Sequence, residues 1–134
     1  RELNAVGIST LVARAGAASA VPGLREGGIS MDALGGQARA LAPTATAFPH
    51  RTALMTVQYT ATFQDGADPA PFDDYVRGFR SALAPQWGEG AYVNYADASL
   101  QDPATAYFGD AAARLAAVRT KYDPGGLFTQ PQAY

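Results

Sequence analysis

The clearest pattern in the chain is an alternation of apolar and polar side chains over residues 53–63. From position 56 onward the even positions are polar, and the odd positions are apolar throughout. Because successive side chains of a β-strand point to opposite faces, this alternation predicts a strand with one apolar and one polar face. The apolar face should pack on helices, and the polar face needs water, a ligand or another domain. The polar positions are Thr56, Gln58, Thr60 and Thr62.

Apolar residues at helical spacing predict helices over residues 3–18, 68–85 and 110–122. An Asp-Pro pair opens the second of these and recurs at 102–103; it combines a favoured N-cap with a residue suited to the first helical position. Pro85 lacks the amide hydrogen that an interior helical residue donates, so we expect it to end the second helix. The residues expected to face inward are Ile8, Leu11, Val12, Ala15, Phe72, Tyr75, Val76, Phe79, Leu83, Leu115 and Val118.

A shorter alternation at residues 28–34 predicts a second strand, with Ser30 and Asp32 on the side opposite Ile29. Residues 37–51 and 88–101 lack periodicity and are expected to be loops. The pattern therefore predicts an α+β fold: an antiparallel sheet of two or three strands with helices on one face, followed by a C-terminal helical segment. Complete sheets usually have more strands, so we expect further strands to lie in upstream sequence.

Composition and motif searches exclude several kinds of site. The chain has 134 residues, a formal net charge of −2 and no cysteine, which excludes disulfides, zinc–thiolate sites and thiol catalysis. It has no basic stripe for nucleic acid and no apolar run long enough to cross a bilayer. It also lacks a Gly-rich dinucleotide motif, a Walker loop and a nucleophile elbow.

The start of the chain predicts a cut or processed polypeptide. Arg1 is not an initiator methionine, and it stands next to the first predicted helix. No signal-peptide pattern follows it. We therefore expect the C-terminal part of a longer protein, for which a cytoplasmic location is favoured and secretion stays open because the N-terminus is missing.

The loop at residues 91–97 holds Tyr92, Asn94 and Tyr95 close together. A tyrosine hydroxyl can accept a proton in catalysis if nearby charge or a hydrogen bond lowers its pKa. The alternative is that both rings anchor the core with satisfied hydroxyls. Gln58 is similarly open to two interpretations: its amide suits a ring system with carbonyls and ring nitrogens, or it belongs to a solvated face.

The single histidine of the chain, His50, has no second histidine with which to form a metal site. A lone histidine in a loop is more often a structural hydrogen-bonding residue than a catalyst. We expect that structural role for His50, and an ion-pair or capping role for its neighbour Arg51. No metal site is predicted.

Five motifs follow one another along the chain: LGG at 34–36, TAFPHR at 46–51, QY at 58–59, AYVNY at 91–95, and a closing run with YFGD at 107–110, KYDP at 121–124 and PQ at 131–132. In this order and spacing they resemble the berberine-bridge-enzyme-like flavoprotein oxidases. The resemblance runs from about residue 28 to the end of the chain.

The resemblance implies a two-module enzyme. One module holds FAD, and a second α+β module lays its sheet over the flavin ring and forms the substrate pocket. Residues 1–90 would be part of the substrate-binding module, and residues 91–134 would be the C-terminal segment that returns to the FAD-binding domain. That domain is absent from this chain, so the chain alone is expected to be inactive. Its partners would be the upstream FAD-binding portion and a small-molecule substrate. Neither nucleic acid nor a membrane is expected as a partner.

The resemblance also implies roles for individual residues. Tyr95 and Gln58 would be catalytic, Tyr92 and Asn94 would join Tyr95 near the flavin, and Thr56 would line the substrate pocket beside Gln58. Hydride would pass from an alcohol or similar carbon to the flavin, a tyrosinate or carboxylate would take the proton, and O₂ would be the acceptor. From alternation alone, the polar positions of the 28–34 strand are further pocket candidates.

One alternative belongs to another class of function. The chain could be a stand-alone, non-catalytic binding or structural domain derived from this module. Such a domain should have a complete sheet without an exposed polar face.

Overall fold

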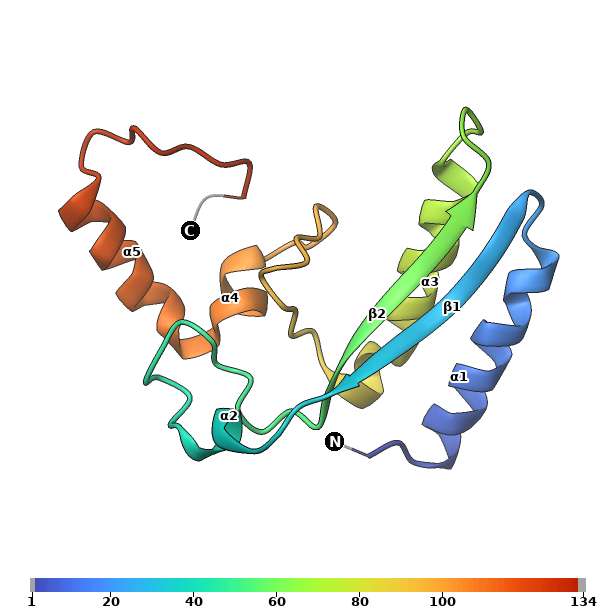
Figure 1. Ribbon diagram of the computed structural model, residues 1–134, viewed down its shortest axis with the longest axis horizontal. Helices are drawn as coiled ribbons and strands as arrows, with labels where there is room; N and C mark the ends of the chain where they lie inside the picture. The colour runs from blue at the N-terminus through green and yellow to red at the C-terminus, as the bar shows by residue number, and fades with distance from the viewer. Residues whose placement is uncertain (1, 133–134) are drawn as a thin grey trace. The chain divides into compact units, whose positions relative to one another are not determined.

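The structure is a computed structural model that describes residues 2–132, and the chain folds into two compact units. The first unit runs to Ala33 and resumes over Leu54–Gly88, and the second comprises Leu34–Ala53 and the described residues from Glu89 onward. Two short 3-10 turns, Ala17–Ala20 and Gly109–Ala111, occur in addition to the helices and strands. The first unit contains α1 (Ala5–Gly16), β1 (Leu24–Ala33), β2 (Met55–Phe63) and α3 (Ala70–Trp87), and the second contains α2 (Gln37–Ala40), α4 (Pro103–Phe108) and α5 (Ala112–Tyr122) (Figure 1).

Strands β1 and β2 form an antiparallel sheet, which confirms the predicted α+β fold class. In the register, Ser30 lies opposite Gln58 and Asp32 lies opposite Thr56. Residues directly opposite each other in an antiparallel pair project to the same face. The polar positions of the two strands therefore share one face of the sheet.

Strand β1 begins earlier than the alternation predicted, because a β-bulge interrupts its pattern. Leu24 pairs with Phe63 and Glu26 pairs with Thr62, so Arg25 is an extra residue between the two pairs. Such a residue shifts the alternation of the strand by one position. As a result, Leu24 packs with the helices, whereas Glu26 lies on the polar face.

The apolar face of the sheet packs on α3 and α1. Phe79 and Leu83 of α3 are fully buried, and the Phe79 ring contacts the Tyr59 ring with centroids 5.4 Å apart. Burial raises the pKa of the Tyr59 hydroxyl to about 12. At the end of β2, Phe63 stacks on Phe72 with centroids 4.1 Å apart. Tyr59, Ala61 and Phe63 of β2 thus face the helices as predicted, whereas Met55 at the start of the strand is exposed. The buried residues of α3 are Phe72, Tyr75, Phe79 and Leu83.

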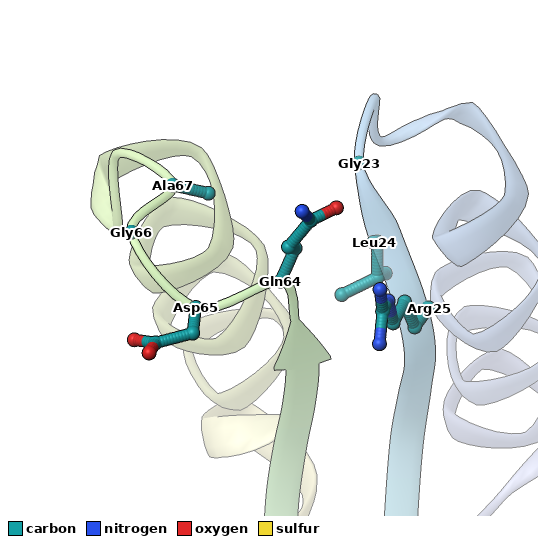
Figure 2. A pocket seen from close by; sticks show the side chains of 7 residues that line it. All are labelled: Gly23, Leu24, Arg25, Gln64, Asp65, Gly66 and Ala67. Atoms are coloured by element: carbon teal, nitrogen blue, oxygen red, sulfur yellow. The ribbon is translucent and has the colours of Figure 1, made fainter.

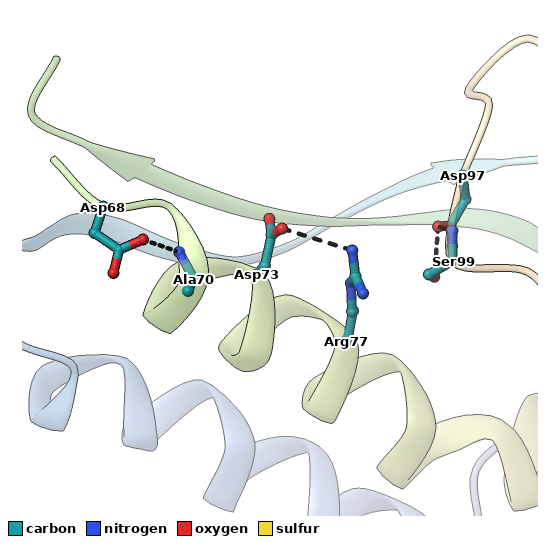
Figure 3. A network of polar contacts seen from close by, with 6 residues as sticks. All are labelled: Asp68, Ala70, Asp73, Arg77, Asp97 and Ser99. Carbon is teal, nitrogen blue, oxygen red and sulfur yellow. Dashed lines mark hydrogen bonds and ion pairs between the residues drawn. The ribbon is translucent and has the colours of Figure 1, made fainter. Parts of the chain in front are cut away.

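The ends of α3 differ from the sequence prediction. Pro85 does not end the helix, which continues to Trp87 and stops at Gly88, whose φ of 86° lies in the left-handed region. Trp87 packs against the core, so tertiary packing keeps the last turn helical although proline donates no hydrogen bond there. The helix begins at Ala70, whose N–H donates to the Asp68 carboxylate at 3.0 Å (Figure 3).

Four residues that were predicted to face inward are exposed. In α1, Leu11 packs against the core, whereas Ile8, Val12 and Ala15 are exposed. In α5, Val118 is exposed. The buried stripe of α1 is narrower than a spacing pattern suggests, because the pattern identifies apolar positions and not the number of elements that cover them.

Gly27 lies on the helix-facing side of β1, where a side chain does not fit. A Cβ there would come within 2.6 Å of Leu24 Cδ2 and 3.0 Å of a Tyr75 ring carbon. We expect Gly27→Ala to lower the free energy of unfolding by about 1–3 kcal/mol through overpacking. Gly28→Ala, which meets no atom within 4 Å, should change it by less than about 0.5 kcal/mol. Urea denaturation followed by Trp87 fluorescence measures both, and equal losses would contradict the packing argument.

The second unit has its own small core, made by Tyr107 and Phe108 of α4 together with Ala111. Asp102 caps α4 as predicted: its carboxylate accepts from the Thr105 N–H at 3.1 Å, and hydrogen bonding to Thr105 lowers the pKa of the Asp102 carboxyl. The core therefore sits directly beneath the loop that precedes α4. The partly buried residues that pack on it are Ala91, Val93, Leu100, Ala112 and Leu115.

Candidate functional site

The face of the β1–β2 sheet opposite the helices is polar. Gln58 and Ser30 lie opposite each other and are both exposed. The neighbouring pair consists of exposed Asp32 and half-buried Thr56. The sheet therefore brings these four predicted pocket residues together on one surface, as their alternation indicated.

The amide of Gln58 makes no hydrogen bond within residues 2–132. An amide offers two donors and one acceptor, so Gln58 can bind a group that presents both functions. The same face carries the carboxylates of Glu26 and Asp32 and several threonine hydroxyls, and its paired positions include no lysine or arginine. This chemistry suits a neutral or cationic partner that exchanges hydrogen bonds.

The other predicted site residues lie on a loop whose first residue is firmly held. The Ala91 N–H donates to the Ala106 carbonyl at 2.9 Å. The Ala91 carbonyl accepts from His50 Nε2 at 2.8 Å. His50 thus has the structural hydrogen-bonding role that the sequence predicted.

The far end of the loop is held by a ring of hydrogen bonds around Asp97. Its N–H donates to the Tyr107 hydroxyl at 2.8 Å, and its carbonyl accepts from Gln132 Nε2 at 2.8 Å. The Tyr107 hydroxyl in turn donates to Gln132 Oε1 at 3.1 Å. The Asp97 carboxylate accepts from the Ser99 N–H and hydroxyl at 2.8 and 2.6 Å (Figure 3). Residues 92–96 therefore span two fixed points.

Between these points the loop presents Tyr92, Asn94 and Tyr95. Asn94 Nδ2 donates to the Tyr92 hydroxyl at 2.9 Å, and the Tyr92 and Tyr95 ring centroids lie 5.9 Å apart. Tyr95 is 62% exposed, and its hydroxyl makes no hydrogen bond within the part of the chain that the structure describes. The interpretation of both rings as core anchors is therefore wrong for Tyr95, while Tyr92 is half-buried.

Arg51 has one of its two predicted roles. It is 8% exposed and forms no ion pair within residues 2–132, so the ion-pair prediction is not met there. Its guanidinium donates to the Ala38 carbonyl of α2 at 3.1 Å and to the Thr46 hydroxyl, which corresponds to the capping role.

Sequence reasoning did not single out Phe48, Tyr107 and Gln132 as supports of the loop at residues 91–97, which we call the tyrosine loop. Each of them stands in one of the five motifs, and that is the signal by which they could have been found. Their contacts leave no local pattern, because Gln132 and Asp97, for example, are separated by 35 positions. The predicted site residues thus form two groups, one in each unit.

An open hollow of about 540 Å³ lies at the end of the sheet and is lined by residues 23–25 and 64–67 (Figure 2). Arg25 and Asp65 are its charged residues. The predicted pocket residues Gln58 and Thr56 do not line it. No helix within residues 2–132 has the length and apolar character of a membrane span, and no cluster of metal-ligating side chains occurs there.

Residues 91–133, which include the tyrosine loop, match the family model described as berberine and berberine like. The chain is also 32% identical over 101 residues to the uncharacterized FAD-linked oxidoreductase YgaK of Bacillus subtilis, an alignment that covers 75% of this chain and 22% of the relative. This chain belongs to the berberine-bridge-enzyme-like FAD-linked oxidoreductases. A second relative, the chitooligosaccharide oxidase of Gibberella zeae, is 34% identical over 116 residues, which cover 78% of this chain and 23% of that protein.

The fold agrees with this membership. A crystal structure of a glycopeptide hexose oxidase complexed with teicoplanin superposes with a TM-score of 0.81 at 26% identity, and the match covers 97% of this chain and 29% of that one. The chain therefore spans about a quarter of the length of these relatives.

Proposed function

We propose that the protein containing this chain is an FAD-dependent oxidase that acts on an alcohol carbon. This chain would supply the sheet face that lies against the flavin ring and the loop that carries the proton acceptor. The observation that carries the proposal is the exposed polar face of β1–β2, on which the Gln58 amide makes no hydrogen bond within residues 2–132.

The residues of the polar face fit a flavin. The isoalloxazine ring presents carbonyls and ring nitrogens, and Gln58 can donate to the first and accept from a ring N–H. The threonine hydroxyls at the neighbouring even positions of β2 have the same double capacity. When bound, FAD would accept a hydride from the substrate carbon and pass the electrons to oxygen.

Tyr95 is the proposed proton acceptor. Its ring is 62% exposed on a loop fixed at both ends, and its hydroxyl makes no hydrogen bond within residues 2–132. A base in this position would take the proton of the substrate hydroxyl as the carbon loses its hydride. Tyr92 and Asn94, which are joined by their own hydrogen bond, would orient the ring system beside it.

The proposed substrate is a neutral alcohol, with sugars as the first class to test. The carboxylates of Glu26 and Asp32 on the proposed pocket face would repel an anion, and the hydroxyls and amide beside them would bind hydroxyl groups. The names of similar proteins, the chitooligosaccharide oxidase and the glycopeptide hexose oxidase, support this class. The net reaction converts a CH–OH group and O₂ to a carbonyl and H₂O₂.

Within this proposal, residues 1–90 contribute to the substrate module, and residues 91–134 form the segment that returns to the FAD-binding portion of the same protein. The chain would be inactive without that portion. The two-stranded sheet has an exposed polar face, which supports a role as part of a larger enzyme. A stand-alone domain would be expected to have a covered or complete sheet.

The complete protein, expressed with its upstream sequence, is expected to purify yellow with bound flavin. Anaerobic addition of glucose, cellobiose or N-acetylchitotriose should bleach the flavin absorbance, and air should restore it with release of H₂O₂. The 134-residue chain, purified alone, is the matched control and should be colourless, because the main FAD-binding surface lies elsewhere. A complete protein without flavin, or one whose flavin no sugar or simple alcohol reduces, would refute the proposal.

A further inference from the structure

The support of the tyrosine loop includes a line of ring contacts that starts at His50. The Phe48 ring meets the His50 ring edge-on, with centroids 5.5 Å apart and planes at 82°. The same Phe48 ring meets Tyr92 edge-on at 5.7 Å and 87°, and Tyr92 contacts Tyr95 at 5.9 Å. Edge-to-face pairs at these separations are favourable and directional. The position of Tyr95 therefore depends on a continuous set of packed rings.

His50 is itself fixed on two sides. Its Nε2 must carry a proton, because the Ala91 carbonyl can only accept the 2.8 Å hydrogen bond between them. Its ring also lies against the backbone of Gly90: a Cβ at that residue would be 3.1 Å from His50 Cε1 and 3.3 Å from Nδ1. The imidazole thus has little room to move relative to the start of the loop.

Phe48 also contacts a buried cation. The Arg51 guanidinium carbon lies 5.0 Å from the centroid of the Phe48 ring, and Arg51 donates to Ala38 and Thr46. A guanidinium over an aromatic face is attracted by the ring quadrupole, more strongly when desolvated. The Phe48 ring therefore packs against Arg51, His50 and Tyr92.

We propose that His50 is a positioning residue for Tyr95. It acts through the Ala91 carbonyl and the Phe48 ring and transfers no proton in the reaction. The proposal rests on the proposed function of Tyr95 as proton acceptor and adds a residue that determines where this acceptor stands. A reacting group displaced by a fraction of an ångström to an ångström loses much of its rate, so the support of the loop should be visible in catalysis.

The test uses the complete, flavin-loaded enzyme and whichever of glucose, cellobiose or N-acetylchitotriose reduces the wild type fastest. His50→Leu removes the donor at similar size and is expected to lower kcat by about 10-fold or more, with flavin content and the pKa values of the kcat–pH profile unchanged. His50→Gln places an amide donor near the position of Nε2 and should restore most of kcat. A merely structural role would lower thermal stability while kcat per bound flavin stays at the wild-type level, which would overturn the proposal.

A second variant keeps the test decisive if His50→Leu fails to fold. Gly90 has no left-handed φ, so Gly90→Ala adds only a methyl group against the His50 ring. It should lower kcat, whereas Gly125→Ala, which meets nothing within 4 Å, should not. Equal kcat values for the two alanine variants would overturn the proposal. So would loss of one limb of the pH profile in both His50 variants, because that would make His50 a proton-transfer group.

The failure of this inference can be told apart from failure of the proposed function. If Tyr95→Phe is slow and His50→Leu is not, the positioning role of His50 is rejected and the role of Tyr95 stands. If Tyr95→Phe is as fast as the wild type, Tyr95 is not the proton acceptor, and the positioning role of His50 is rejected as well.

Discussion

Tyr95→Phe is expected to lower the rate of flavin reduction in the complete holoenzyme by about 100-fold or more, which is the usual contribution of a general base. The substitution removes one hydroxyl from a side chain that is 62% exposed and whose hydroxyl makes no hydrogen bond within residues 2–132. No internal contact of the described chain is lost, so folding and flavin content should stay the same. Anaerobic stopped-flow measurement of flavin reduction separates this step from reoxidation.

Two other tyrosines serve as controls for that experiment. Tyr122→Phe alters an exposed tyrosine of α5 outside the loop and should leave the rate of reduction at its wild-type value. Tyr92→Phe removes only the acceptor of the Asn94 hydrogen bond and should have an intermediate effect. If Tyr95→Phe reduces its flavin as fast as the Tyr122 control, Tyr95 is not the proton acceptor.

Phe79→Ala is expected to lower the free energy of unfolding of the first unit by about 3–5 kcal/mol, the usual cost of removing a buried phenylalanine ring. Phe79 has no exposed surface, and its ring contacts both Tyr59 and Tyr75, with centroids 5.4 and 6.0 Å apart. The cavity would lie where α3 meets the sheet. Urea denaturation of the 134-residue chain can be followed by its only tryptophan, Trp87, which packs on this core.

Arg77→Ala is the matched control on the same helix. Its guanidinium lies 3.6 Å from the Asp73 carboxylate, and both side chains are more than half exposed (Figure 3). Exposed pairs of this kind contribute at most about 1 kcal/mol. A loss of less than about 1 kcal/mol in Phe79→Ala, similar to the control, would mean that the first unit is not built around α3 as described.

The sequence was sufficient for the parts of the fold that follow a simple period. The alternation in β2 predicted its end and the face that meets the helices, although the strand begins at Met55 and not at residue 53. The spacing in α3 predicted its buried residues. The start of β1 could not be predicted, because the extra residue Arg25 places Leu24 and Glu26 on opposite faces although they are two positions apart. The prediction that Pro85 ends α3 was wrong for a different reason. The packing of Trp87 outweighs the hydrogen bond that is missing at one proline.

The candidate site was predictable to a similar degree. The alternation and the β1–β2 register together account for the shared face of Gln58, Thr56, Ser30 and Asp32, but a strand pattern alone does not reveal which residue of β1 lies opposite which residue of β2. The supports of the tyrosine loop could not be predicted from local sequence patterns, because His50 and Ala91, which share a hydrogen bond, lie 41 positions apart. Such contacts depend on the tertiary fold and leave no period in the sequence.

The hydrogen-bond ring of Asp97, Tyr107 and Gln132 couples three distant parts of the chain energetically. Tyr107 accepts from the Asp97 N–H, Gln132 donates to the Asp97 carbonyl, and the two side chains are joined by their own hydrogen bond. Removing either side chain therefore also frees the other from one of its hydrogen bonds. Substitutions within one such network do not have additive effects. In a family alignment, positions 107 and 132 should therefore vary together, and the tail of the chain should be under selection for the loop that it holds.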